Sequence, residues 1–423
     1  MVDAVLAEAG GMQRRVRALP SRVVVYVLLA GALFAGLGYR QVWSRLVAGL
    51  PGPSVVPSSS ALAQARRRVG TAPLKALFEL LRGPAASVGG GVRWRGLLVC
   101  AIDGTIISVP DSAANLAAYP RQSGSAFAML RLVAVVACGT PSIIGAVFGG
   151  AGSGETTYAA RLAGVLGEGM IVLADRNFAA GWLVAAIAAT RAQLLVRVRT
   201  GRQAPRLPVM RRLGDGSYLS RLGGIEVRVI DAEITIVTSA GRTTGAYRLI
   251  TTLTGHRDYP AGDLVRLYHQ RWEIETAYLE LKSCMLEGRV LRARTPAGID
   301  QEVYALLVAY QAVRTAMTDA TNTDPSIDPD RAAFTVAVNA ARDQIVRATG
   351  ILANTTIDLA GKIGRAVLED LLPDRRLRTN ARTLKRAISK YNARGPNIDR
   401  TTYKATLAID ILAGPPLTRT PDP

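Results

Sequence analysis

The chain has few residues that could form disulfides or bind a transition metal. Its 423 residues include three cysteines, at 100, 138 and 284, and two histidines, His256 and His269. These residues are scattered, so neither a disulfide framework nor a zinc site with known ligand spacing can be assembled from them. This absence fits a protein of a reducing, cytosolic compartment.

The chain also lacks an apolar run long enough to span a bilayer. The longest candidate, residues 23–38 (VVVYVLLAGALFAGLG), follows the basic residues Arg14, Arg15, Arg17 and Arg22 and resembles a signal sequence or a short membrane span. It falls short of the ~20 apolar residues that a bilayer requires, and no A-x-A cleavage site follows it. We therefore expect a buried helix here, and a membrane-associated basic protein is the alternative.

Acidic residues are underrepresented. The 52 Lys and Arg exceed the 32 Asp and Glu, which gives a net charge of +20 and a pI near 10.5. This imbalance indicates a polyanionic partner, with nucleic acid as the first candidate and an acidic membrane surface as the second. Residues 375–404 contribute ten Lys or Arg against the single Asp399, and we expect a DNA-backbone contact there rather than only a solvated tail.

The length suggests several domains, which the pattern places at 1–90, 91–320 and 321–423. The first is expected to be helical and to bind DNA. Ser58 to Ser60 can cap a helix that presents Arg66, Arg67 and Arg68, although a solvated basic face is the other interpretation. The last is expected to be helical and basic.

The middle region begins with buried strands, expected at 97–102, 130–138, 142–148, 170–174 and 194–198, with a helix at 181–190. Asp103 follows the first of these strands and Asp175 the fourth. A lone aspartate at such a position is commonly a helix cap or a turn former. However, the order strand, strand, strand, helix, strand, helix is that of a ribonuclease H-like α/β domain with a mixed sheet, in which these two strand ends are neighbours. A mostly β insertion is expected at about 200–256.

A continuous helix is expected between Pro260 and Gly288. At 100° per residue, Tyr268, Arg271, Glu275 and Lys282 fall within a roughly 60° arc of its surface. Solvated ion pairs are one interpretation of this arc. In a ribonuclease H-like domain, a later helix also brings a glutamate over the two aspartates. Carboxylates gathered in this way suit Mg²⁺ or Mn²⁺.

In these motifs the chain resembles the DDE transposases of bacterial insertion sequences, in the branch marked by a Y-R-E-K signature. The signature is Tyr268, two residues, Arg271, three residues, Glu275, six residues, Lys282. Asp103-Gly-Thr and Asp175-Arg-Asn-Phe match the contexts of the first two acids, and the resemblance extends to the apolar N-terminal helix and to the basic segment 385–395.

The resemblance implies an enzyme that binds terminal inverted repeats, cleaves the DNA ends and joins them to target DNA. Asp103, Asp175 and Glu275 would hold two Mg²⁺ or Mn²⁺ ions per active site. Arg271 and Lys282 would clamp phosphates, and Tyr268 would hydrogen-bond the DNA backbone.

Two further residues are implied to contact DNA: Arg176, which follows Asp175, and Tyr247. Some relatives excise through a DNA hairpin and stack a flipped base on a tryptophan, at a position to which Tyr247 corresponds. A structural tyrosine in a strand is the alternative.

The resemblance further implies a homodimer when the protein is synapsed on DNA. It implies no membrane partner and a bacterial cytoplasmic location with nucleoid association. The alternative is a transposase-derived DNA-binding protein without catalysis, which the intact acidic triad disfavours.

Overall fold

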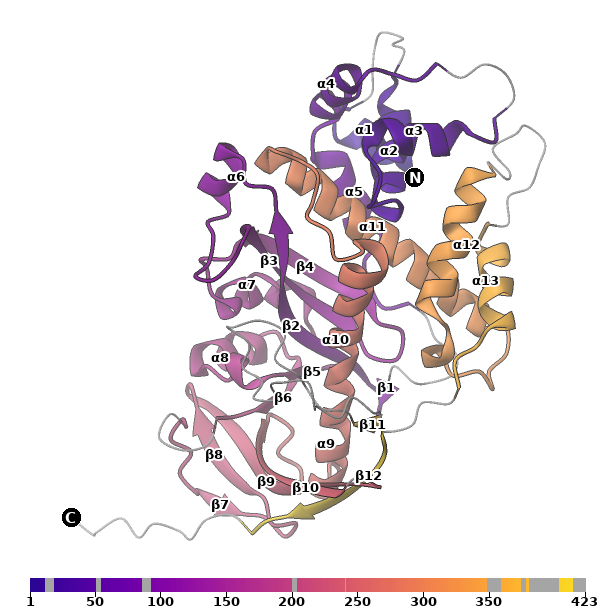
Figure 1. Ribbon diagram of the computed structural model, residues 1–423. Coiled ribbons are helices and arrows are strands. Elements are labelled where there is room, and N and C mark those ends of the chain that lie inside the picture. The colour runs from indigo at the N-terminus through magenta and orange to yellow at the C-terminus, as the bar shows by residue number, and fades with distance from the viewer. Residues whose placement is uncertain are drawn as a thin grey trace. The chain divides into compact units, whose positions relative to one another are not determined.

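The computed structural model describes residues 1–11, 19–50, 55–85, 93–199, 204–239, 241–347, 359–373, 378–379 and 403–413. The chain forms two compact units, whose elements are labelled in Figure 1. The first unit comprises Met1–Arg93, Gly104–Ser153 and Glu273–Pro373, and the second comprises Trp94–Asp103, Gly154–Trp272 and Asp374–Pro423. Strand β2 (Leu97–Val109) contributes its first half to the second unit and the rest to the first.

In its described N-terminal part, the first unit has five helices: α1 (Val2–Glu8), α2 (Ser21–Leu33), α3 (Tyr39–Val47), α4 (Ser59–Val69) and α5 (Ala72–Leu81). Most of α2 is buried, which confirms the expected buried helix. No helix in the described ranges is both long and apolar enough to cross a membrane. At the start of α4, the Ser58 hydroxyl accepts a hydrogen bond from the Ala61 amide at 3.1 Å, so the predicted cap is confirmed. Arg14, Arg15 and Arg17 lie outside the described residues.

The long helix α11 (Pro296–Thr321) is the centre of packing in this unit. It packs against α2 and α5, and also against α12 (Phe334–Val346) and α13 (Leu359–Glu369). Its N-cap is Thr295, whose side chain accepts from the Gly298 amide, and Pro296 occupies the first helical turn, where a proline is tolerated. The helices α12 and α13 confirm helical structure in the C-terminal region.

The first unit also contains an antiparallel hairpin formed by β3 (Ala128–Ala137) and β4 (Ser142–Gly150). The strand β3 adjoins β2, and the short helix α6 (Ala113–Ala118) lies between them in sequence. The hairpin confirms the second and third predicted strands. The prediction of a first strand at 97–102 that ends before Asp103 is partly wrong, because β2 continues through Asp103 to Val109. The uncharged residues 104–109 allow this extension.

In the second unit, β2, β5 (Met170–Ala174) and β6 (Gln193–Arg197) run parallel. Between them in sequence lie α7 (Glu155–Arg161), η1 (Ala163–Val165), η2 (Arg176–Phe178) and α8 (Gly181–Ala188). The central residues of these three strands are buried and, apart from Cys100, are Val, Ile, Leu and Ala, as expected of parallel strands covered on both faces. The predicted strands 170–174 and 194–198 are thereby confirmed.

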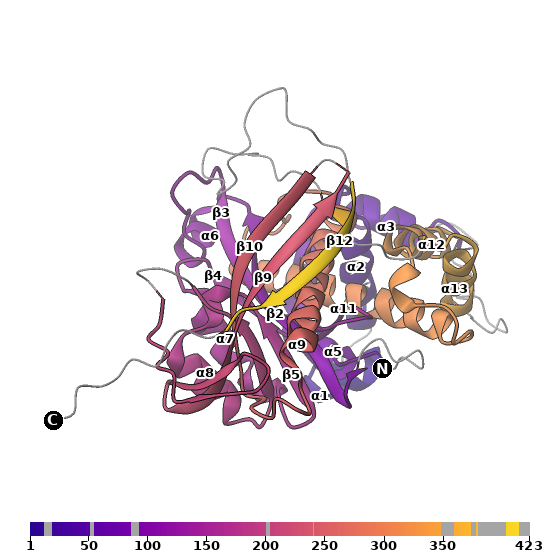
Figure 2. The same ribbon diagram turned by 90° about the horizontal axis from the view of Figure 1, so that it is seen from below.

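Antiparallel strands continue the sheet of the second unit beyond β6. They are β7 (Arg211–Arg212), β8 (Tyr218–Leu222), β9 (Ile225–Thr238) and β10 (Gly241–Thr251). The strand β10 pairs with both β6 and β9, and Figure 2 shows β9 and β10 side by side. The expected mostly β character of residues 200–256 is therefore present in the described part.

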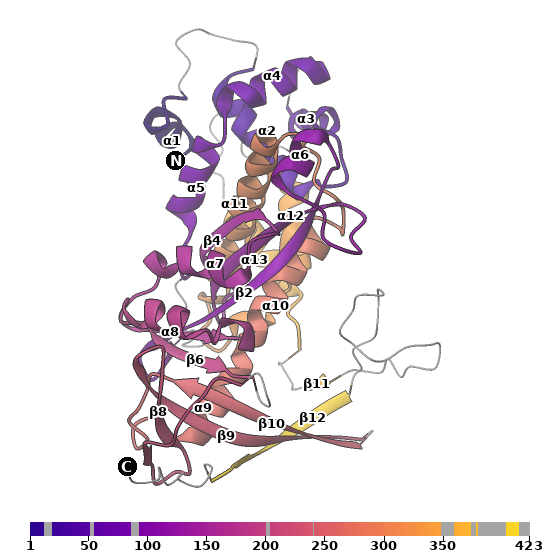
Figure 3. The ribbon, with the colours of Figure 1, turned by 90° about the vertical axis from the view of Figure 1, so that its left-hand side faces the viewer.

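The strand β12 (Tyr403–Ile411) pairs antiparallel with β9, as Figure 3 shows, and with β11 (Arg378–Thr379). The expectation of helix is wrong for residues 403–411. The alternation of apolar residues with Lys404, Thr406 and Asp410 has the period of a strand. The remainder of the basic segment 375–404, including residues 385–395, lies outside the described residues.

The helix expected after Pro260 is divided rather than continuous. In the second unit, α9 (Ala261–Tyr268) ends in the 3₁₀ turn η3 (His269–Arg271). The helix α10 (Trp272–Leu279), which lies in the first unit from Glu273 onward, ends in the π-helical turn η4 (Glu280–Met285). The uniform rotation of 100° per residue therefore does not hold from Tyr268 to Lys282, and the predicted arc is wrong in detail. Residue periodicity alone does not reveal a π turn.

Candidate active site

The register of two parallel strands brings Asp103 and Asp175 to adjacent positions in the second unit. Ile102 pairs with Ala174 at the end of the parallel ladder between β2 and β5. Asp103 is the next residue of β2, and Asp175 follows directly after β5 as the N-cap of η2. Both residues are half-buried, and the Asp175 carboxylate accepts a hydrogen bond from the Arg176 amide, which begins η2. This register places the two aspartates next to each other, as the sequence predicted.

The end of α9 and the turn η3 add a cation and a phenol to this pair of acids. Arg271 Nη1 donates a hydrogen bond to Asp103 Oδ2 at 3.5 Å, and the Tyr268 hydroxyl donates to the Ala174 carbonyl at 3.2 Å. Burial raises the pKa of Tyr268; the Arg271 cation opposes this effect and the Asp175 carboxylate adds to it. The phenol therefore remains a neutral donor at physiological pH.

Glu275 and Lys282 lie in the first unit. Glu275 is a half-buried residue of α10, and Lys282 occupies the π turn η4. Lys282 Nζ donates a hydrogen bond at 3.4 Å to the hydroxyl of Thr105, two residues beyond Asp103 on β2. The meeting of Glu275 with Asp103 and Asp175, which belong to the other unit, remains a prediction.

Two residues outside the Y-R-E-K signature, Glu273 and Tyr278, hold α10 against the β3–β4 hairpin. The Glu273 carboxylate is buried and accepts a hydrogen bond from the Gly139 amide in the hairpin turn. The Tyr278 hydroxyl accepts from the Ala134 amide of β3 at 3.0 Å. An acid two residues before Glu275 gave no sequence signal, because charged residues are common on the exposed faces of helices.

The side chains of Asp103 and Asp175 suit a hard divalent cation. Both supply carboxylate oxygens, the ligands that Mg²⁺ and Mn²⁺ prefer, and two adjacent acids create the negative charge that such an ion neutralises. Within the described part of the chain, no three or more His, Cys, Asp or Glu side chains form a group that could hold a metal ion. Asp103 and Asp175 therefore suit such an ion as two of its ligands, and Glu275 as the third ligand remains a prediction.

Tyr247 and Arg176 lie on the same unit as the two aspartates. Tyr247 is half-buried on β10, where the guanidinium of Arg197 lies 4.0 Å from the centre of its ring. Arg176 is exposed in η2. Arg197 was missed at the sequence level, although the alternating basic residues Arg197 and Arg199 at the end of β6 were a signal. Arg199 in turn donates to Asn177 at 3.2 Å.

The basic helix α4 does not present all three of its arginines. Arg66 Nη2 lies 3.7 Å from Glu302 Oε1, its guanidinium lies 4.0 Å from the centre of the Tyr39 ring, and its side chain is only 14% exposed. Arg67 and Arg68 are exposed. The expected presentation of Arg66 to DNA is therefore wrong, because a buried glutamate of α11 binds it.

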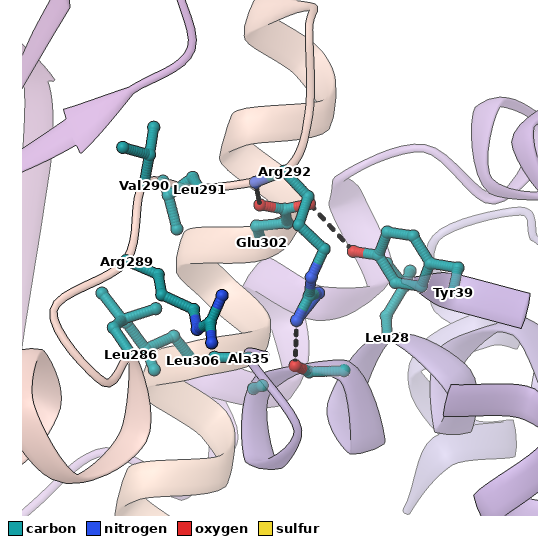
Figure 4. A pocket seen from close by; sticks show the side chains of 12 residues that line it. Leu28, Ala35, Tyr39, Leu286, Arg289, Val290, Leu291, Arg292, Glu302 and Leu306 are labelled. Carbon is teal, nitrogen blue, oxygen red and sulfur yellow. Dashed lines mark hydrogen bonds between the residues drawn. The ribbon is translucent and has the colours of Figure 1, made fainter. Parts of the chain in front are cut away.

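A small cavity of about 20 Å³ lies beside this cluster, between α2 and the segment that precedes α11. Tyr39 and the backbone amide of Arg292 both donate to Glu302, as Figure 4 shows. The donor–acceptor distances are 3.0 and 2.7 Å. The Arg292 side chain donates to the Gly31 carbonyl of α2. The cavity has room for about one water molecule, and these contacts connect the N-terminal helices to α11.

The chain is similar in sequence to known proteins. Residues 1–79 match the family described as insertion element 4 transposase N-terminal, and residues 94–312 match the family described as transposase DDE domain. The chain is similar to the transposase InsG for insertion sequence element IS4 of Escherichia coli K12, with 27% identity over 92% of this chain and 91% of that protein. A solved structure of the piggyBac transposase synaptic complex with hairpin DNA aligns at a TM-score of 0.41 and 11% identity, covering 88% of this chain and 82% of that one.

Proposed function

The chain belongs to the DDE transposases of the insertion element 4 family, and we propose that it cuts and joins DNA at the centre formed by Asp103, Asp175 and Glu275. As a member of this family, it is a DNA transposase with a ribonuclease H-like core. Its activity is that of a polynucleotidyl transferase that depends on divalent metal ions. The observation that supports the assignment of Asp103 and Asp175 is the β2–β5 register, which sets the two side by side. Glu275 is proposed as the third ligand from its place in the Y-R-E-K signature.

In this proposal the three carboxylates bind two Mg²⁺ or Mn²⁺ ions. The ions would supply activation of the attacking hydroxyl and stabilisation of the departing oxygen in an in-line phosphodiester displacement. The protein residues hold the carboxylates in place: Tyr268 fixes the backbone immediately before Asp175 through the Ala174 carbonyl, and Glu273 holds the helix that carries Glu275.

Arg271 and Lys282 bind the DNA backbone in this proposal. The planar guanidinium of Arg271 can donate to two oxygens of one phosphate. When DNA binds, it would give up part of its present contact with Asp103 to do so. Lys282 would attract phosphate as a point charge. Tyr268 and Arg176 add contacts near the cleaved end. The ring of Tyr247, backed by Arg197, offers an aromatic surface on which an unstacked base can rest.

The DNA partners in this proposal are the terminal inverted repeats of the element and a target duplex, held by a homodimer in the synapsed state. The net charge of +20 supports binding to such a polyanion. We place the protein in the bacterial cytoplasm, associated with the nucleoid when it is bound to DNA. The divisions at residues 90 and 320 are retained as proposed domain boundaries.

The proposal is tested with duplex DNA carrying the inverted repeats that flank the reading frame. Purified protein with Mg²⁺ is expected to nick at the repeat ends and to join the released 3′ ends to a second duplex. The variants Asp103→Ala, Asp175→Ala and Glu275→Ala should bind the repeats and fail to nick. Cleavage at the wild-type rate by any one of them would refute this assignment of the site.

A further inference from the structure

The π turn η4, which carries Lys282, is held by a buried ionic cluster of the first unit. Glu280, the first residue of the turn, forms an ion pair with Arg314 of α11, and their side chains are 10% and 6% exposed. The Tyr310 hydroxyl lies 3.0 Å from Glu280 Oε2 and also 3.0 Å from the Pro141 carbonyl. We call Glu280, Tyr310 and Arg314 the Glu280 cluster.

Every charged group of the Glu280 cluster has a partner. Arg314 donates from Nε to the Tyr310 oxygen at 3.2 Å and from Nη2 to Glu280. Its guanidinium lies 5.1 Å from the centre of the Phe334 ring and 5.8 Å from that of Tyr310. A buried network whose charged groups are paired in this way favours one arrangement of the elements that it joins, here η4, α11 and the β3–β4 turn.

The backbone of η4 is arranged differently from that of an α-helix. The Leu286 amide donates to the Leu281 carbonyl at 3.0 Å, five residues earlier, and the Gly288 amide donates to the Lys282 carbonyl at 2.8 Å. π turns are rare and concentrate at functional sites. Because each residue added to a helix turns the side chains after it by roughly 100°, the π turn sets the direction in which Lys282 points.

We propose that the Glu280 cluster is a positioning device that fixes the π turn and thereby holds the Lys282 ammonium beside Thr105, two residues past Asp103. The observed Lys282 to Thr105 distance of 3.4 Å is the result of this positioning. Glu280, Tyr310 and Arg314 are positioning residues, since none of them contacts DNA in this scheme. The inference rests on the phosphate-binding role proposed for Lys282.

The test is a double-mutant cycle. Because removing only one partner of a buried ion pair leaves a buried charge and threatens folding, both partners are replaced by uncharged side chains of similar length in Glu280→Met/Arg314→Met. This variant should unfold at a temperature close to that of the wild type. Lys282→Ala is then introduced into the wild type and into the Met/Met variant, and cleavage of repeat-end DNA is measured for all four proteins.

In the wild-type background, Lys282→Ala should slow cleavage about 10-fold or more, as expected when a charged hydrogen-bond donor is lost. In the Met/Met background, the same substitution should slow cleavage less than about 2-fold, because the ammonium is already displaced. The exposed pair Asp343 and Arg347, replaced by Asn and Gln, serves as the control and should leave the full effect of Lys282→Ala intact.

An equal effect of Lys282→Ala in the wild-type and Met/Met backgrounds would overturn the positioning role and leave the phosphate-binding role standing. A Lys282→Ala protein that cleaves at the wild-type rate in the wild-type background would overturn both. If the Met/Met variant does not fold, Glu280→Gln/Arg314→Met, which also removes both buried charges, takes its place in the same cycle and is judged by the same ratio.

Discussion

Arg271 lies beside Asp103, with its Nη1 atom 3.5 Å from the carboxylate Oδ2. The same guanidinium lies 6.0 Å from the centre of the Tyr268 ring, and Tyr268 in turn binds the backbone that leads into Asp175. In the second unit, the first two residues of the Y-R-E-K signature are therefore in contact with the strands that carry the first two acids. In the proposed site, Tyr268 and Arg271 therefore have separate roles that can be measured.

Replacing Arg271 with alanine should weaken binding to repeat-end DNA at low salt and make binding less sensitive to salt. Loss of one phosphate contact lowers the slope of log K against log salt by about one. Arg271→Lys should restore the slope but only part of the cleavage rate, because lysine lacks the planar fork. Affinities measured over a series of salt concentrations test this.

Arg191, which is 80% exposed and faces Glu168 at 3.5 Å, provides the matched control for Arg271. Arg191→Ala also removes one positive charge from the second unit, but at a position that does not contact Asp103 or Asp175. If Arg191→Ala and Arg271→Ala change the salt slope equally, the effect is one of net charge and the phosphate contact of Arg271 is rejected.

Replacing Tyr268 with phenylalanine should lower the free energy of unfolding by about 1 kcal/mol, because the Ala174 carbonyl loses a hydrogen-bond donor. Cleavage should fall more than DNA binding, since the hydroxyl holds the chain next to Asp175 and the residue is only 7% exposed. Urea unfolding and a binding titration measure the two effects. Weakened binding at unchanged stability would show that the hydroxyl acts mainly through the proposed DNA contact and not by supporting the backbone before Asp175.

The start of α9 is held by a buried ion pair between Asp215 and Arg228, whose side chains are 22% and 0% exposed. Asp215 also accepts a hydrogen bond from the Ala261 amide at 3.0 Å, and Arg228 donates to the Tyr259 carbonyl at 2.6 Å. Asp215→Ala leaves Arg228 buried without its partner and should lower the free energy of unfolding by about 3 kcal/mol.

The control for Asp215 is Glu168→Gln, at a residue whose side chain is 78% exposed in an ion pair. Its effect on the free energy of unfolding should stay below about 0.5 kcal/mol. Equal effects of the two substitutions in a urea titration would show that the Asp215 pair does not stabilise the fold.

The sequence was sufficient to predict the features that depend on local pattern. The buried strand 170–174 coincides with β5, because an apolar run bounded by Gly169 and Asp175 leaves little freedom in its limits. The cap at Ser58 follows from the chemistry of its hydroxyl. The adjacency of Asp103 and Asp175 follows from the strand order, which the family resemblance supported.

Other features that depend on long-range pairing were not predictable from the local sequence pattern. The π turn that begins at Glu280 is associated with an ion pair to Arg314, 34 residues later in the chain. The local sequence pattern does not predict such a contact. The burial of Arg66 depends on Glu302, and the strand β12 depends on an edge of β9 far away in sequence. In each case a distant partner determines the outcome more strongly than local propensity does.

The most direct test of the central claim is a change of ligand at the three acids. Asp103, Asp175 and Glu275 are each replaced by cysteine, whose softer thiolate binds Mn²⁺ better than it binds Mg²⁺. Cleavage of repeat-end DNA by each variant is measured with either ion. We predict at least about 100-fold slower cleavage in Mg²⁺ for all three variants and partial recovery in Mn²⁺. Cleavage at the wild-type rate in Mg²⁺ by any of the three would contradict its role as a metal ligand.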